Sequence, residues 1–181
     1  LNVRGVVSVS DSADTTTGGI VGINHGTLIN CQFTGVVTGD SEVGGIVGRN
    51  ESEGTIDHST ARAIVTGKSS TGGIAGYNLG AITGCTNVGS INTEYPEASL
   101  DTDGFTAKMV DYINNKMAAA ADDATNSVTN VATDTGGIAG RSSGMILTSV
   151  NTGTIGYEHV GYNVGGIVGR TDGLVSGCVN Q

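Results

Sequence analysis

Apolar residues recur along this chain in short runs separated by glycine, asparagine, serine and threonine, and the runs return at a regular interval. The pentapeptide GGIVG or GGIAG starts at residues 18, 44, 72, 136 and 165, so successive starts are 26, 28, 64 and 29 residues apart. Short β-branched runs bounded by glycine and asparagine are typical of strands and turns. The pattern therefore predicts a repeat of 26–29 residues, built of short strands and interrupted once by a large insertion.

Each repeat contains three expected strands, which in the first copy are 19–21, 27–29 and 35–37. A unit of this length cannot bury an apolar face alone, so the copies must stack, with neighbouring strands about 4.8 Å apart. We therefore expect one all-β domain spanning 1–181, a parallel β-helix (β-solenoid) with about five coils and three short strands in each. The chirality of parallel crossovers favours the right-handed form.

Two columns of apolar residues are expected to fill the coils. One lies at the centre of the pentapeptides, at Ile20, Ile46, Ile74, Ile138 and Ile167. The other follows a later glycine, at Leu28, Ile56, Ile82, Ile146 and Leu174. A third position carries a small residue in every copy, namely Cys31, Ser59, Cys85, Ser149 and Cys178. Cysteines two coils apart are separated by about 9–10 Å, too far for a disulfide, so we expect free thiols rather than a disulfide framework or a metal site.

The repeated glycines are expected to turn the corners, because glycine adopts a positive φ cheaply and has no Cβ to crowd a bend. Asn24, Asn50 and Asn78 follow the pentapeptides, where a short polar side chain can bond to the local backbone and tolerate a left-handed conformation. A phosphate-cradling loop would need a following helix and a lysine at a set spacing, and both are absent from the pattern. We expect no cofactor.

Residues 94–135 interrupt the repeat between its third and fourth copies. Phe105, Met109, Tyr112 and Met117 recur there at helical spacing, which predicts one amphipathic helix near 103–121. Its apolar stripe is expected to pack against the flank of the solenoid, with docking of a partner as the alternative.

The segments that join one repeat to the next, 40–43, 68–71, 94–135 and 157–164, all precede a pentapeptide and so leave from the same corner. Variable segments of a solenoid gather on one edge, which is often the binding face, and tyrosine is favoured in contacts. The candidate ligand-binding or partner-binding edge comprises five aromatic residues: Tyr95, Phe105, Tyr112, Tyr157 and Tyr162. The alternative is that these residues anchor the helix and fill gaps.

Charge excludes several partners. The chain has 8 Lys and Arg against 17 Asp and Glu, a net charge of −9, so no basic stripe is available for nucleic acid. No apolar stretch is long enough to span a bilayer, so membrane insertion is not expected.

A zinc peptidase motif is missing, since YEHVGYN at 157–163 lacks the second histidine. Asp57, His58 and Arg62 are the only local cluster suited to glycan chemistry, and a solvated corner explains them better. We therefore expect no enzymatic activity.

The five G-G-I-[VA]-G motifs resemble those of the GLUG-motif repeat proteins, which occur in bacterial surface and secreted proteins, including adhesin-like chains and the repeat regions of M26-type immunoglobulin A peptidases. The resemblance implies a β-helix in an extracellular or cell-surface setting and leaves the ligand undefined. A host protein or glycan is the expected partner. The expected function is a non-catalytic adhesion, binding or spacer segment. An accessory domain of a secreted M26-like peptidase is the alternative, and a carbohydrate-active β-helix is a third reading.

Both ends of the sequence fall within a repeat, which indicates a piece of a longer solenoid. Open strand edges at such ends invite pairing with another chain, so weak end-to-end self-association is expected.

Overall fold

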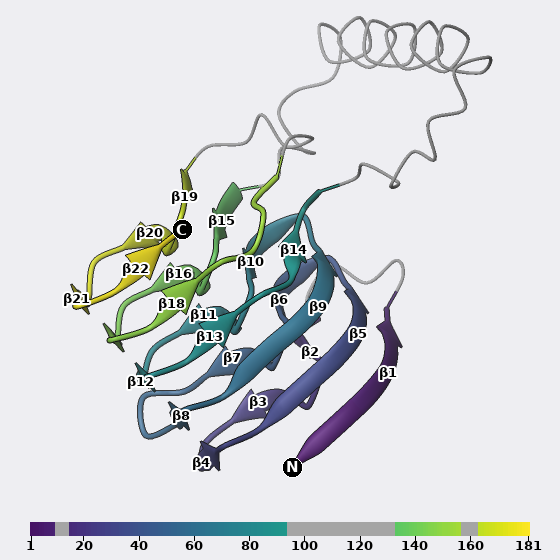
Figure 1. Cartoon of the computed structure of the whole chain (residues 1–181), viewed down its shortest axis with the longest axis horizontal. Helices are drawn as coiled ribbons and strands as arrows, with labels where there is room; N and C mark the ends of the chain where they lie inside the picture. The colour runs from purple at the N-terminus through teal and green to yellow at the C-terminus, as the bar shows by residue number, and fades with distance from the viewer. Residues whose placement is uncertain (10–14, 94–132, 157–162) are drawn as a thin grey trace, which may run out of the picture. The chain divides into compact units, whose positions relative to one another are not determined.

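The structure is a computed structural model that describes residues 1–9, 15–93, 133–156 and 163–181 (Figure 1). All regular elements in these ranges are β-strands, and every pairing between them is parallel. The described residues of the unit Leu1–Thr93 and Ala132–Gln181 form a β-solenoid whose sheets run along the stack of coils. The expected all-β parallel solenoid of about five coils is confirmed. Its right-handed sense stays a prediction.

Four sheets, here called A to D, make the walls of the solenoid. Sheet A contains β1 (Asn2–Ser8), β5 (Gln32–Thr38), β9 (Thr60–Thr66), β13 (Thr86–Asn87), β18 (Val150–Asn151) and β22 (Val179–Asn180), with β14 (Ser90–Ile91) also paired to β9. Sheet B contains β2 (Thr17–Gly18), β6 (Ser41–Gly44), β10 (Ser69–Gly72), β15 (Thr133–Gly136) and β19 (Val164–Gly165).

The other two sheets follow the pentapeptide in each coil. Sheet C contains β3 (Val21–Asn24), β7 (Val47–Asn50), β11 (Ala75–Asn78), β16 (Ala139–Ser142) and β20 (Val168–Thr171). Sheet D contains β4 (Thr27–Ile29), β8 (Thr55–Asp57), β12 (Ala81–Thr83), β17 (Met145–Leu147) and β21 (Leu174–Ser176). Figure 1 shows each sheet as a row of strands, one from each successive coil.

The expected count of three strands per coil is wrong, because each complete coil contributes a strand to all four sheets. The additional strand lies in sheet B, at Ser41–Gly44 and Ser69–Gly72, where irregular joining segments were expected. Apart from the buried Val43, these runs are polar and show no apolar alternation, but their backbone groups pair with the neighbouring coils. The first glycine of the pentapeptide ends this strand, and the next two residues turn the corner into sheet C.

The core follows the expected columns, with one correction. Ile46, Ile74, Ile56 and Ile82 are 0 % exposed, as are Ile138 and Ile146 in the fourth coil. Leu174 was assigned to the interior, but it is 52 % exposed and pairs with Met145. Val175 pairs with Ile146 and packs against the core instead. The sequence-based assignment was wrong by one residue in this coil, and a shift of one residue moves a strand side chain to the opposite face of the sheet.

The pentapeptide glycines are needed for close backbone approach rather than for a positive φ. A Cβ on Gly73 would lie 2.3 Å from the Gly137 carbonyl oxygen of the next coil and 2.4 Å from Asn87 Cγ. Among the described residues, the glycines with positive φ lie outside the pentapeptides, at Gly35, Gly84 and Gly177. The prediction that these glycines are needed because they lack a Cβ is therefore confirmed. The prediction that they adopt a positive φ is wrong.

Residues in the left-handed conformation occur in or beside sheet B, at Glu42, Ser70, Asp134 and Asn163, and also at Asn92. The column of residues with this conformation that continues through all five coils is at the corner between sheets D and A. Five residues stacked from coil to coil adopt it there: Asn30 (φ 51), His58 (φ 44), Gly84 (φ 60), Thr148 (φ 45) and Gly177 (φ 64). Asn24, Asn50 and Asn78 do not have a positive φ, but Asn24 bonds locally as expected, donating to the Gly26 carbonyl at 3.1 Å.

The helix expected near 103–121 lies outside the described residues. Strand β15 begins at Thr133, so the last three residues of the expected insertion, 133–135, already belong to the solenoid.

Candidate binding surface

One position of the repeat places chemically varied side chains on the outside of sheet C. It is the residue directly after each pentapeptide, which pairs in register from coil to coil and comprises Ile23, Arg49, Tyr77, Arg141 and Arg170. All five are at least partly exposed, whereas the residues that follow them in β7, β11 and β16 are buried. A continuous column of side chains therefore runs along this sheet, and we call it the arginine–tyrosine column.

Tyr77 lies between two arginines of this column. The guanidinium carbon of Arg49 is 5.6 Å from the centre of the Tyr77 ring, and that of Arg141 is 5.2 Å from it. Each cation–π contact at a partly exposed site contributes about 0.5–1 kcal/mol. The Tyr77 hydroxyl is 3.2 Å from Ser143 Oγ, which fixes the ring further. The three stacked side chains therefore present a defined surface rather than independent flexible groups.

The two ends of the column differ in how their charge is balanced. Arg49 Nε donates to Glu42 at 2.8 Å, Arg49 Nη2 contacts the other oxygen of the same carboxylate, and Glu51 lies 3.8 Å from Nη1. The hydrogen bond with Glu42 is the main cause of the raised pKa of Arg49. Arg141 and Arg170, in contrast, form no ion pair within the described part of the chain.

Asp172 is the acidic residue beside the unpaired arginines. Its pKa is lowered, first by a hydrogen bond with the Ser143 side chain and then by the positive charges of Arg141 and Arg170. Asp172 is exposed, and its carboxylate is therefore ionised and accessible to solvent at neutral pH. The C-terminal end of the column thus combines two arginines, one carboxylate and the Ser143 hydroxyl.

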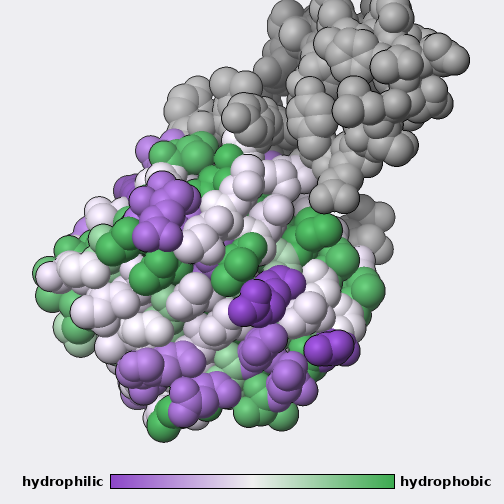
Figure 2. All heavy atoms as spheres, in the orientation of Figure 1, coloured by the Kyte–Doolittle hydropathy of each residue, from purple (hydrophilic) through white to green (hydrophobic). Residues whose placement is uncertain are grey.

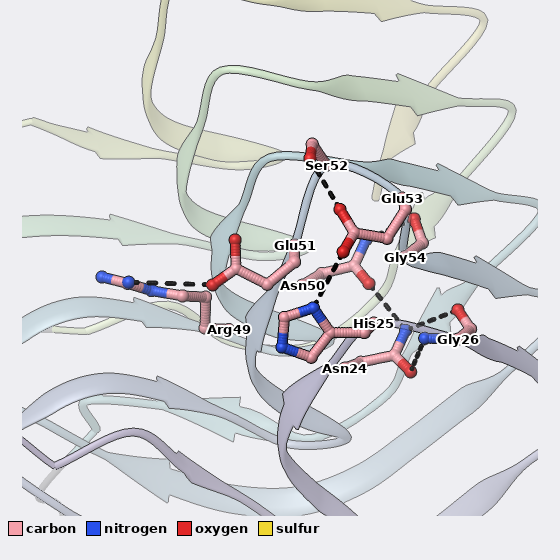
Figure 3. A network of polar contacts seen from close by, with 9 residues as sticks. All are labelled: Asn24, His25, Gly26, Arg49, Asn50, Glu51, Ser52, Glu53 and Gly54. Atoms are coloured by element: carbon pink, nitrogen blue, oxygen red, sulfur yellow. Dashed lines mark hydrogen bonds and ion pairs between the residues drawn. The ribbon is translucent and has the colours of Figure 1, made fainter.

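A second polar cluster occupies the corner that follows sheet C in the first two coils (Figure 3). His25 Nδ1 is 2.9 Å from Glu53 Oε1, and Ser52 Oγ donates to Glu53 Oε2 at 2.7 Å. These contacts, the His25 bond first, lower the pKa of Glu53 to about 2. The three side chains are exposed at a turn, and we assign them to the local conformation of that turn.

Beneath this corner runs a buried ladder of amide side chains. Asn24 Nδ2 donates to Asn50 Oδ1 at 2.8 Å, Asn50 Nδ2 donates to Asn78 Oδ1 at 2.8 Å, and Asn78 Nδ2 donates to Ser142 Oγ at 3.1 Å. Figure 3 shows the first of these bonds directly below His25 and Glu53. The ladder joins coil to coil and supports the strand that carries the arginine–tyrosine column.

The five aromatic residues predicted to form a binding edge lie outside the described residues: Tyr95, Phe105, Tyr112, Tyr157 and Tyr162. That edge stays a prediction.

Asp57, His58 and Arg62, the cluster considered for glycan chemistry, lie within the described part of the chain. Asp57 and His58 form an exposed ion pair of 2.9 Å at the left-handed corner, and Arg62 lies on β9 and bonds to neither. This arrangement agrees with the interpretation as a solvated corner.

The cysteines are free, as expected. Cys31 and Cys85 are buried and Cys178 is partly exposed. Cys31 and Ser59 stack in neighbouring coils, as predicted for the small-residue position of the repeat, because the Cys31 backbone N–H donates to Ser59 Oγ at 3.1 Å. Burial raises the pKa of the Cys85 thiol to about 12.

The described part of the chain lacks two further kinds of feature. Its described residues contain no group of three His, Cys, Asp or Glu side chains that could hold a metal ion. They also contain no helix of the length and apolarity needed to cross a bilayer.

Residues 39–66, which include all four strands of the second coil, match the family described as the GLUG motif. The other coils repeat the register of this one strand for strand. The second coil therefore carries a GLUG motif, and the pentapeptide of that coil recurs in the other four. No curated protein and no solved structure matches the chain.

The arginine–tyrosine column was missed in the sequence, although a signal for it was present. Its members occupy one fixed place, the residue immediately after each GLUG pentapeptide. Sequence reasoning looked for positions that repeat, and this position varies between apolar, cationic and aromatic residues. Tabulating the variable positions by repeat would have grouped its three arginines.

Proposed function

We propose that this GLUG-repeat chain is a non-catalytic β-helical segment of a bacterial cell-surface or secreted protein, and that it binds a host protein or glycan through its outer surface. The observation that supports this most is the division of positions within the repeat. The inward column at the centre of the pentapeptides is isoleucine in every coil, whereas the arginine–tyrosine column changes from coil to coil. A constant core beneath a varied exposed column is typical of repeat scaffolds that bind partners along an extended surface.

The distribution of apolar residues favours a polar binding surface. The exposed large apolar side chains include Val6, Ile29, Ile64 and Val164. Val6 and Ile64 lie in one column of sheet A with Val36 between them, whereas Ile29 and Val164 lie on sheets D and B. On the face shown in Figure 2, hydrophobic and hydrophilic residues are interleaved. Single exposed apolar residues are normal on soluble surfaces. Recognition through charge and hydrogen bonds is therefore the better-supported mode.

Two measurements test this proposal. Antibodies against the folded chain should label intact cells of the source organism or detect the protein in the medium, and labelling only after permeabilisation would contradict the location. The folded chain should also bind members of an array of host proteins and glycans, and heat-unfolded chain should not. An array without any binder would contradict the binding role.

A further inference from the structure

We propose that the C-terminal end of the arginine–tyrosine column, formed by Arg141 and Arg170 with Asp172 and Ser143 beside them, binds the carboxylate of a single acidic sugar at the end of an otherwise neutral glycan. The inference rests on the proposed binding function and names the class of its ligand. It starts from the contrast between the paired arginine at one end of the column and the two unpaired ones at the other.

Arg141 and Arg170 are directly opposite each other on neighbouring strands of sheet C. Like charges in that arrangement repel and destabilise a sheet. Arg49 has the uncharged Ile23 and Tyr77 as its cross-strand neighbours and is also paired with Glu42, but the described residues supply no carboxylate in ion-pair contact with Arg141 or Arg170. Asp172 supplies one negative charge beside the two arginines, and a bound carboxylate would supply the second.

The geometry at Arg141 suits such a ligand. Its guanidinium is stacked on Tyr77, and its Nε atom is buried without a hydrogen-bond partner in the described structure. The terminal nitrogens of the guanidinium are therefore the groups left to meet a ligand. Guanidinium groups bind carboxylates through two parallel hydrogen bonds, and a held orientation reduces the entropy lost on binding.

The surrounding groups favour a sugar over an acidic peptide. Asp172, Ser143 and the exposed Thr171 offer hydroxyl and carboxylate oxygens that can bond to sugar hydroxyls. An extended peptide gains affinity mainly by pairing with a free strand edge, but β16 is already paired on both sides, to β11 and β20. The free edge of β20 is on the side away from β16, so a peptide paired there would not lie between Arg141 and Arg170.

Net charge decides how many acidic groups the ligand carries. The whole chain has a charge of −9, so a densely charged polysaccharide is repelled over most of the surface. One carboxylate on a neutral glycan gains the contact with the two arginines and avoids most of that repulsion. Lactose capped with one sialic acid is a suitable probe, and lactose alone is its uncharged counterpart.

The test is a titration of the full 181-residue chain with sialyllactose, followed by NMR chemical shifts and calorimetry. We expect binding that is lost with lactose. Arg141→Gln and Arg170→Gln should each weaken it at least about tenfold, because a charge-assisted hydrogen bond is removed. Arg62→Gln removes the same charge from an exposed site on sheet A and should change the affinity less than about twofold. Arg170→Gln breaks no ion pair of the described structure and removes the repulsion from Arg141, so its melting temperature should not fall below that of the wild type.

Several results would overturn the inference. Equal binding of lactose and sialyllactose would show that the carboxylate is not recognised. An equal loss in Arg62→Gln would show that only net charge matters. Tighter binding of a neutral peptide with one glutamate would assign the column to a protein partner. If sialyllactose does not bind while other members of the array do, the proposed ligand class is wrong and the proposed binding function stands. If no member of the array binds, both the ligand class and the binding function are wrong.

Discussion

The buried asparagine ladder gives the sharpest stability test, and Asn50 is the residue to change. Asn50 is 0 % exposed and accepts a hydrogen bond from Asn24. Its Nδ2 group donates to Asn78 Oδ1 at 2.8 Å, to the Gly54 carbonyl at 3.1 Å and, at the longer distance of 3.4 Å, to the Ala81 carbonyl. Asn50→Ala removes all of these bonds and leaves a void between the coils.

The loss can be estimated from these contacts. Asn50→Ala removes two side-chain hydrogen bonds between coils, each contributing about 1 kcal/mol to the free energy of unfolding. Polar groups left unpaired in the interior cost about 1–2 kcal/mol more, so the free energy of unfolding should fall by about 3–4 kcal/mol. In a chain of this size 1 kcal/mol shifts the melting temperature by about 2–4 °C, so we expect a decrease of about 6–16 °C. Asn50→Ser is the matched control, because Ser142 occupies the same position one coil beyond Asn78 and accepts its bond. The serine variant should lose clearly less stability.

The assay is thermal and urea unfolding followed by circular dichroism, with Asn50→Asp added to test the donor role. The buried carboxylate of Asn50→Asp would face carbonyl oxygens, so its folded-state pKa should be raised above the unfolded value of about 3.9. Below that unfolded value both states are protonated and the penalty is absent, and stability relative to wild type should fall as the pH rises above it. An Asn50→Ala variant that melts within about 2 °C of wild type would refute the reasoning.

Three further predictions concern the glycines, the thiols and the ends of the stack. Gly73→Ala should prevent normal stacking in chemical unfolding experiments because its Cβ would lie 2.3 Å from a carbonyl oxygen, whereas Gly5→Ala, with nothing within 4 Å, should unfold like wild type. In native protein at pH 8, mass spectrometry after thiol labelling should find Cys178 modified and Cys85 untouched, and early labelling of Cys85 would contradict its burial and its raised pKa of about 12. Light scattering should detect weak, concentration-dependent end-to-end association through the unpaired edges of β1 and β22, and a strict monomer at high concentration would contradict it.

The solenoid could be predicted from the sequence because its core depends on spacing alone. Ile46, Ile74 and Ile138 recur at the centre of the pentapeptide, and each is fully buried in its own coil. The strand count could not be predicted in the same way. Sheet B consists of runs such as SSTG at Ser69–Gly72, which have no apolar alternation and form a strand because the coils on both sides offer backbone partners. Local sequence does not contain that information.

A second asparagine ladder illustrates the same limit within the core. Asn87 Nδ2 donates to Asn151 Oδ1 at 2.8 Å, and Asn151 Nδ2 donates to Asn180 Oδ1 at 2.7 Å. In the first two coils the same column is occupied by Phe33 and Ala61. One interior position is therefore filled by apolar packing at one end of the stack and by amide hydrogen bonds at the other. Only the register shows that these unlike residues are equivalent.

The binding surface depends on register in the same way, which explains why sequence reasoning looked elsewhere. Tyr77 and Arg141 are 64 positions apart in the chain, yet the insertion between them leaves the two residues on adjacent strands with the guanidinium over the ring. Aromatic residues within the joining segments stand out in the sequence because they break the repeat. Residues inside the repeat but outside its constant positions do not stand out, although they are the ones that stacking brings together. In a solenoid, therefore, a binding column is best sought among the positions that are regular in spacing and irregular in chemistry.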